Sequence, residues 1–116
     1  MTGELLFLCH RIPFPPDRGD KIRSYHLLQR LAQMAPVHVG CFADDDRDMG
    51  FAPDMAQLTA SQCVLMRDRS RMVAGFTGLA RGQSLLVSLF DHPDLHRWVA
   101  QVMAERPIRA VIAYSA

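Results

Sequence analysis

The sequence lacks any long apolar run, and this absence excludes several classes of protein. Its N-terminal segment, MTGELLFLCHRIP, carries an acid where a signal peptide has basic residues, and the uninterrupted apolar stretch LLFLC is far shorter than a membrane span. We therefore expect a cytoplasmic protein, with at most a peripheral contact at the inner face of the membrane.

A strong net charge is also missing. The formal net charge is +1 at neutral pH and the pI is near 7.8, so the chain has no general electrostatic field that would attract nucleic acid. We expect no nucleic-acid partner. Any binding of an anion must come from a local grouping of basic residues.

The chain has three cysteines, and none is at the CxxC spacing typical of metal or redox sites. Each lies within or at the end of an apolar run, which predicts buried reduced thiols for Cys9, Cys41 and Cys63. His92 and His96 are spaced as a zinc-binding pair on a helix, but no third ligand is near in sequence. We expect neither a metal nor a cofactor.

The length of 116 residues and the apolar content of 49% suit one domain with one core. Apolar runs of strand length and amphipathic helical periods alternate, which predicts an α/β fold: a Rossmann-like, doubly wound parallel sheet of about four strands in the order 3-2-1-4, with helices on both faces. The segment 83–90 is ambiguous between strand and helix. The expected strands are Glu4–Cys9, Val37–Phe42, Gln62–Arg67 and Arg109–Ser115; the expected helices start near Lys21, Met72 and Pro93; the expected core holds Leu6, Leu8, Val39, Cys41, Val64, Val111 and Ile112.

The junction PFPPDRGDKIR, between the first strand and the first helix, has a composition suited to an anionic ligand. In a parallel sheet, ligands bind beyond the carboxyl ends of the strands. Gly19 permits close backbone approach, Asp20 is placed to cap the helix, and the amides that follow it face outward. Lys21 and Arg23, which we expect at the surface, add charge, as does Arg18. The alternative is that Asp20 only caps the helix and the basic side chains are solvated.

Several familiar sites are not indicated. The junction has one glycine, whereas the dinucleotide fingerprint GxGxxG needs three, and RGDKIR lacks the GK[ST] ending of a phosphate-binding P-loop. The acids Asp44, Asp45, Asp46 and Asp48 are placed to meet a ribose or a metal, but a solvated loop is the favoured interpretation. No Ser-His-Asp or Cys-His arrangement is indicated, since Ser115 lies near the end of the chain and the cysteines look buried.

The segment LFLCHRIPFPPDRGDKIRSYHLLQRLA resembles the N-terminal start of bacterial GT-B fold glycosyltransferases of the family-4-like type. It is most similar to the sugar transferases of PEP-CTERM/exosortase exopolysaccharide systems. The likeness is most specific over Leu5 to Ala32, and it continues more loosely through SLFDHPDLHRWV and the last strand. It implies that residues 1–116 are the acceptor-side Rossmann-like domain, that the donor-binding domain is absent, and that the chain is truncated.

The resemblance also implies an activity. The whole enzyme would transfer a hexosyl group from a nucleotide sugar to a glycan or lipid-linked acceptor in exopolysaccharide or other cell-surface glycan biosynthesis, while this fragment alone would be inactive. Gly19, Asp20, Lys21 and Arg23 would form the cleft wall near the donor diphosphate or the acceptor. The resemblance identifies no catalytic residue.

Two other functions stay open. One is a non-catalytic Rossmann-like module that binds a phosphate or a partner through the same junction. The other is a contact with a membrane surface through a helix with basic flanks, although a helix packed in the core is favoured. The residues concerned are Arg67, Arg69, Arg71 and Arg81 around the apolar Met72, Val73, Phe76 and Leu79.

Overall fold

The computed structural model describes residues 3–17, 19–67 and 92–114. Four strands in these segments form one parallel sheet in the order β3-β2-β1-β4, which confirms the predicted topology. The helix expected near Met72, its proposed membrane contact and the ambiguous segment 83–90 lie outside the described residues. The strands are β1 (Glu4–Cys9), β2 (Val37–Ala43), β3 (Ser61–Met66) and β4 (Ile108–Tyr114).

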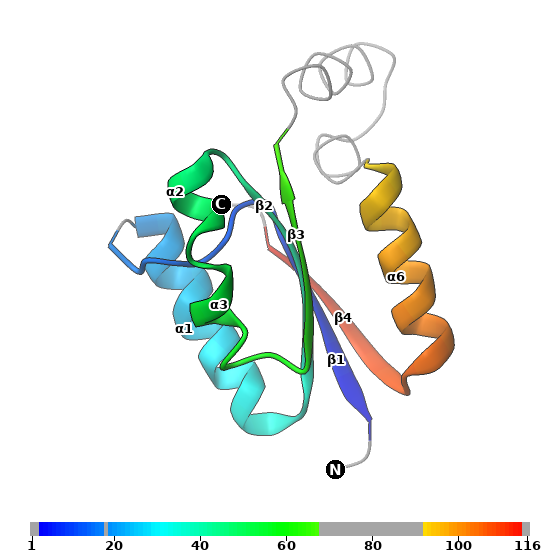
Figure 1. Cartoon of the computed structure of the whole chain (residues 1–116). Coiled ribbons are helices and arrows are strands. Elements are labelled where there is room, and N and C mark those ends of the chain that lie inside the picture. Colours follow the sequence, from blue (N-terminus) through cyan, green and yellow to red (C-terminus); the bar gives the residue numbers. More distant parts are fainter. Residues whose placement is uncertain (1–2, 18, 68–91, 115–116) are drawn as a thin grey trace, which may run out of the picture.

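Helices cover both faces of the sheet, as a doubly wound fold requires. The long helix α1 (Gly19–Met34) and the short helices α2 (Asp46–Met49) and α3 (Ala52–Met55) lie on one face, and α6 (Pro93–Glu105) lies on the other (Figure 1). None of the helices in the described segments is long and apolar enough to cross a membrane.

The main core lies between the sheet and α1. Alternate residues of the two central strands face it and are at most 6% exposed, because side chains in a strand point to opposite faces in turn. Burying a large apolar side chain contributes about 1.5–3 kcal/mol. The strand residues of this layer are Leu5, Phe7, Cys9, Val37, Val39 and Cys41, and the helix contributes Leu28 and Leu31.

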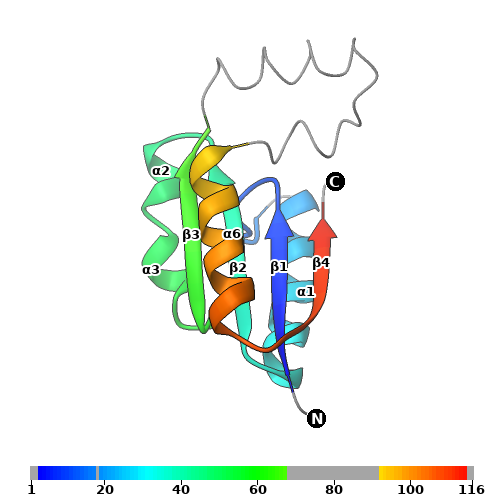
Figure 2. The same ribbon diagram turned by 90° about the vertical axis from the view of Figure 1, so that its right-hand side faces the viewer.

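The predicted core is largely confirmed. Leu6, Val39 and Cys41 are fully buried, whereas Leu8, Val64 and Ile112 are half-buried. Placing Val111 in the core was wrong, because its side chain is 51% exposed. β4 is an edge strand of the described sheet, and α6 packs on β2 and β3 instead (Figure 2). No described helix therefore covers Val111.

The prediction of buried reduced thiols holds fully for two of the three cysteines. Cys9 and Cys41 are buried, Cys63 is half-buried, and all three are free thiols. The hydrogen bond with Cys9, and then burial, raises the pKa of the Cys41 thiol well above its usual value, and burial raises the pKa of Cys63. Both effects disfavour the reactive thiolate.

Gly40 sets how closely α6 approaches the sheet. A Cβ atom at this position would lie 2.8 Å from Leu95 Cδ1 and 3.0 Å from Trp98 Cζ3, both on α6. These distances are shorter than normal van der Waals contact. The missing side chain in the middle of β2 thus provides the space in which α6 packs.

Candidate functional site

Charged residues follow three neighbouring strands of the sheet at the point where each strand ends. The carboxyl ends of parallel strands meet at one edge, which we call the carboxyl edge, and the structure brings these residues together there. They are Arg11 after β1, Asp44 and Asp48 after β2, and Arg67 after β3.

Asp48 is the centre of this cluster and is only 1% exposed. Arg11 Nε donates to its Oδ2 at 2.9 Å, and Lys21 Nζ donates to its Oδ1 at 2.8 Å. Burial alone would raise the pKa of Asp48, but the hydrogen bonds from Arg11 and Lys21 outweigh it and lower the pKa to about 2. Asp48 is therefore a carboxylate at neutral pH, and its charge is balanced from within the protein.

The expectation that Lys21 lies at the surface was wrong. The residue is 2% exposed, and besides its bond to Asp48 its Nζ donates to the Phe14 carbonyl at 2.8 Å. Lys21 belongs to the buried stripe of α1 that continues through Ser24 and Leu28, at helical spacings of three and four residues. The ammonium group is tolerated there because Asp48, 27 residues away in sequence, neutralises it.

The start of α1 also differs from the prediction. The helix begins at Gly19, so Asp20 lies within its first turn. Gly19 is exposed, and a Cβ atom there would make only an ordinary contact, 3.7 Å from Arg23 Nη1. Nothing in the described structure therefore requires glycine at this position. Arg18 lies outside the described residues.

Arg23 is the one predicted basic residue whose side chain the structure places at the surface of the carboxyl edge. Its Nε donates to Tyr114 Oη at 3.2 Å. Tyr114 ends β4, which pairs with β1, so Arg23 lies where the strand order reverses. Ligands of open α/β sheets bind at such a reversal.

His10 lies at the same reversal and was missed from the sequence. Its backbone N–H donates to the Tyr114 carbonyl at 3.3 Å, and its Nδ1 is buried without a hydrogen-bond partner in the described structure. A buried polar atom without a partner is costly. A signal was present, because His10 directly follows the first strand, as Arg11 does.

The acidic loop after β2 was correctly predicted to be exposed at Asp44, Asp45 and Asp46, but not at Asp48. Asp45 caps α2 by accepting from the Asp48 N–H at 2.8 Å. Asp44 Oδ1 accepts from Arg67 Nε at 2.8 Å, and Arg67 also donates to the His10 carbonyl. The loop therefore holds ionic contacts that tie β1, β2 and β3 together.

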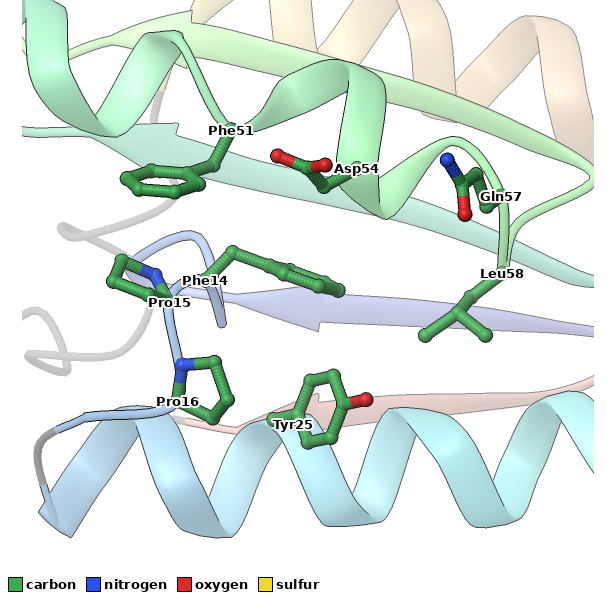
Figure 3. A pocket seen from close by; sticks show the side chains of 8 residues that line it. All are labelled: Phe14, Pro15, Pro16, Tyr25, Phe51, Asp54, Gln57 and Leu58. Carbon is green, nitrogen blue, oxygen red and sulfur yellow. The ribbon is translucent and has the colours of Figure 1, made fainter.

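A groove of about 390 Å³ lies between the proline-rich junction, α1 and the α2–α3 segment (Figure 3). Phe14 and Tyr25 meet edge to face in it, with their ring centroids 5.1 Å apart. Aromatic faces with a few polar groups suit a ligand that combines an apolar ring face with hydroxyl groups. The lining residues are Phe14, Pro15, Pro16, Tyr25, Phe51, Asp54, Gln57 and Leu58.

Metal ligation finds no support in the described segments. They contain no group of three His, Cys, Asp or Glu side chains able to hold an ion. His92 has a structural role instead, because its Nδ1 accepts from the Asp94 N–H at 3.1 Å and so caps α6.

Comparison with known proteins adds nothing to this description. No family model, curated protein or solved structure matches the chain.

Proposed function

We propose that residues 1–116 form the acceptor-side domain of a glycosyltransferase. The enzyme transfers a hexosyl group from a nucleotide sugar to a glycan or lipid-linked acceptor, in the synthesis of exopolysaccharide or another cell-surface glycan. The observation that carries the proposal is the position of Arg23, an exposed guanidinium held by Tyr114 where the order of the parallel strands reverses.

Arg23 suits the diphosphate that departs from a nucleotide sugar. A guanidinium presents a planar set of donors that matches phosphate oxygens and keeps its charge at all physiological pH values. Donors fixed before the reaction stabilise charge that develops on a leaving group. The hydrogen bond from Arg23 Nε to Tyr114 fixes the side chain in this way.

Lys21 has a different role in this proposal from the one that its sequence position indicates. Its ammonium group is buried against Asp48 and the Phe14 carbonyl, so it binds the protein and not the substrate. It fixes the proline-rich junction against α1, and the junction forms one wall of the aromatic groove. That groove, with Tyr25 and Phe51 beside Asp54, takes a sugar ring of the acceptor.

Binding can be tested on the isolated chain. Isotope-labelled protein is titrated with UDP and with inorganic pyrophosphate while the amide resonances of Gly19, Arg23 and Tyr114 are followed. We expect saturable shifts at these residues that are lost in Arg23→Ala, because a charge-assisted contact contributes about 1.5–3 kcal/mol. Arg97→Ala is the matched control, since Arg97 is an exposed arginine on α6, which covers the opposite face of the sheet from α1 (Figure 1).

Transfer is tested in a protein that contains this chain together with a donor-binding domain. Release of labelled sugar to an acceptor, lowered by Arg23→Ala, supports the proposal. Binding of pyrophosphate without transfer of any sugar supports the non-catalytic phosphate-binding module instead. Absence of both refutes the assignment of this edge as an anion site.

A further inference from the structure

A chain of three polar side chains lies at the opposite end of the sheet, on the face that α6 covers. Glu4, His38 and Ser61 stand at or near the starts of β1, β2 and β3. His38 Nε2 is 2.7 Å from Glu4 Oε1, and His38 Nδ1 is 2.5 Å from Ser61 Oγ. We call these residues the amino-edge chain. The sequence does not indicate this arrangement, because Glu4 and His38 lie 34 residues apart and His38 and Ser61 lie 23 residues apart.

The Glu4 carboxylate also forms an ion pair with Arg106. Arg106, directly after α6, donates from Nε and Nη2 to the two oxygens of Glu4, each at 2.9 Å. The hydrogen bonds from Arg106 and then from His38 lower the pKa of Glu4. Glu4 is therefore an acceptor only, fixed by a planar two-point contact.

The ionised carboxylate determines where the proton of His38 lies. A carboxylate acceptor at Nε2 requires a proton on that nitrogen, so in the neutral form of the ring the lone pair lies at Nδ1. In that form the hydroxyl of Ser61 donates to the lone pair. This is the direction of hydrogen bonding by which a base activates a serine nucleophile in hydrolases.

The chain opens into a cavity of about 330 Å³ under α6. This volume falls within the range of small-molecule sites, about 300–1,000 Å³. Trp98 and Val102 supply apolar walls. The Gln101 amide and the Arg106 guanidinium also line the cavity, and the N–H groups that do not bond to Glu105 and Glu4 supply donors. A short acyl group fits the apolar walls, and a carbonyl oxygen fits the donors.

We propose that the amino-edge chain hydrolyses small carboxylic esters with short acyl groups, with Ser61 as the nucleophile. Ser61 Oγ forms a bond to the ester carbonyl carbon while its proton passes to His38 Nδ1. The C–O bond to the alcohol then breaks, and the leaving oxygen takes that proton. Water attacks the acyl-serine in the same way, gives a proton to His38, and releases the acid with Ser61 reprotonated. Glu4 is a positioning residue that holds the ring of His38. This activity is independent of the function proposed for the carboxyl edge.

The first test needs no variant. The folded chain is treated at neutral pH with a fluorophosphonate probe, and the labelled peptide is identified by mass spectrometry. We expect labelling on Ser61 that disappears when the protein is unfolded in urea before treatment. Labelling that is absent, or that is no stronger on Ser61 than on other serines, overturns the proposal.

The second test is hydrolysis of p-nitrophenyl acetate. Ser61→Ala and His38→Gln should each lower kcat/KM by at least about 100-fold, because a general base contributes that much or more. Thr59→Ala is the matched control, since its hydroxyl lies two residues from Ser61 but bonds to Gln62. Unchanged hydrolysis in Ser61→Ala, with the variant folded by circular dichroism, means that surface groups cleave the ester and the proposal is wrong.

Glu4→Gln tests whether Glu4 positions the ring of His38 for the reaction or only stabilises the fold. An amide can donate to His38 Nε2 and so favour the wrong tautomer. We expect kcat to fall while KM stays within about twofold, and labelling of Ser61 to slow in parallel. Equal labelling rates in wild type and in folded Glu4→Gln would remove Glu4 from the mechanism.

Discussion

The two ends of the sheet both contain ionisable groups that little solvent reaches, yet they use them differently. At the carboxyl edge, Asp48 lies between Arg11 and Lys21, and the three charged groups satisfy one another. At the amino edge, Arg106 balances Glu4, and the hydrogen bonds continue through the ring of His38 to the hydroxyl of Ser61 beside a cavity.

Polar groups that only stabilise the fold therefore differ from those that stay available for a reaction. A closed ion pair uses its charges to fix loops and leaves none for a ligand, so Lys21 is a poor candidate for substrate binding despite its basic neighbourhood. An open chain that ends on a neutral donor at a cavity keeps a group available for reaction.

The largest effect is expected from Asp48→Ala. Removal of this carboxylate leaves the buried ammonium of Lys21 unpaired, which costs about 3–5 kcal/mol in similar cases. Urea unfolding should show this loss in the free energy of unfolding. Replacing both partners, as Asp48→Leu with Lys21→Met, should be less destabilising than Asp48→Ala alone. A double variant that is no more stable than Asp48→Ala would show that Asp48 and Lys21 stabilise the fold by more than neutralising each other.

The pH dependence of stability is the next effect in size. The pKa of Asp48 is lowered from 3.8 to about 2 on folding, so its contribution is present above about pH 4 and is lost as the pH falls through about 2. The shift corresponds to about 2 kcal/mol. Unfolding in urea across this range should show a shallower acid loss in Asp48→Asn than in wild type. Parallel curves would mean that Asp48 is not the titrating group.

Gly40→Ala tests how closely α6 must pack on the sheet. Gly40 belongs to neither of the two polar clusters. A Cβ atom there meets Leu95, Leu8 and Trp98 at 2.8–3.0 Å, and overpacking of this kind costs about 1–3 kcal/mol. We expect a value near the low end of this range, because the contacts are with the ends of side chains. Labelling of Ser61 should fall as the cavity wall at Trp98 moves. Unchanged labelling would show that the cavity does not depend on how closely α6 packs on the sheet at Gly40.

The smallest effect on stability is expected from Arg23→Ala. Its guanidinium is exposed, and surface substitutions of this kind change the free energy of unfolding by less than about 0.5 kcal/mol. The variant should nevertheless lose the pyrophosphate-dependent shifts at the carboxyl edge. A loss of stability as large as that of Asp48→Ala would show that Arg23 stabilises the fold, as Asp48 does, and would contradict this prediction.

Local patterns in the sequence were enough for the framework. Continuous apolar runs predicted β1 at its observed bounds and each other strand to within one residue at either end, and the helical period of Leu95, Val102 and their neighbours predicted a helix that starts near Pro93, where α6 begins. Right-handed crossovers together with helices on both faces favoured the strand order 3-2-1-4, which the structure confirms. The strands and helices themselves follow from local patterns, because local geometry decides them.

Only the tertiary structure decided which polar groups are buried and with what partner. Lys21 and Arg23 look alike in the sequence, but one faces Asp48 across the sheet edge and the other faces Tyr114 at the surface. Val111 looks like a core residue, yet its strand lies beyond the cover of α6. Glu4, His38 and Ser61 have no common motif. The register of three parallel strands brings them together, and that register depends on how the helices and strands pack, which is not a property of any one segment.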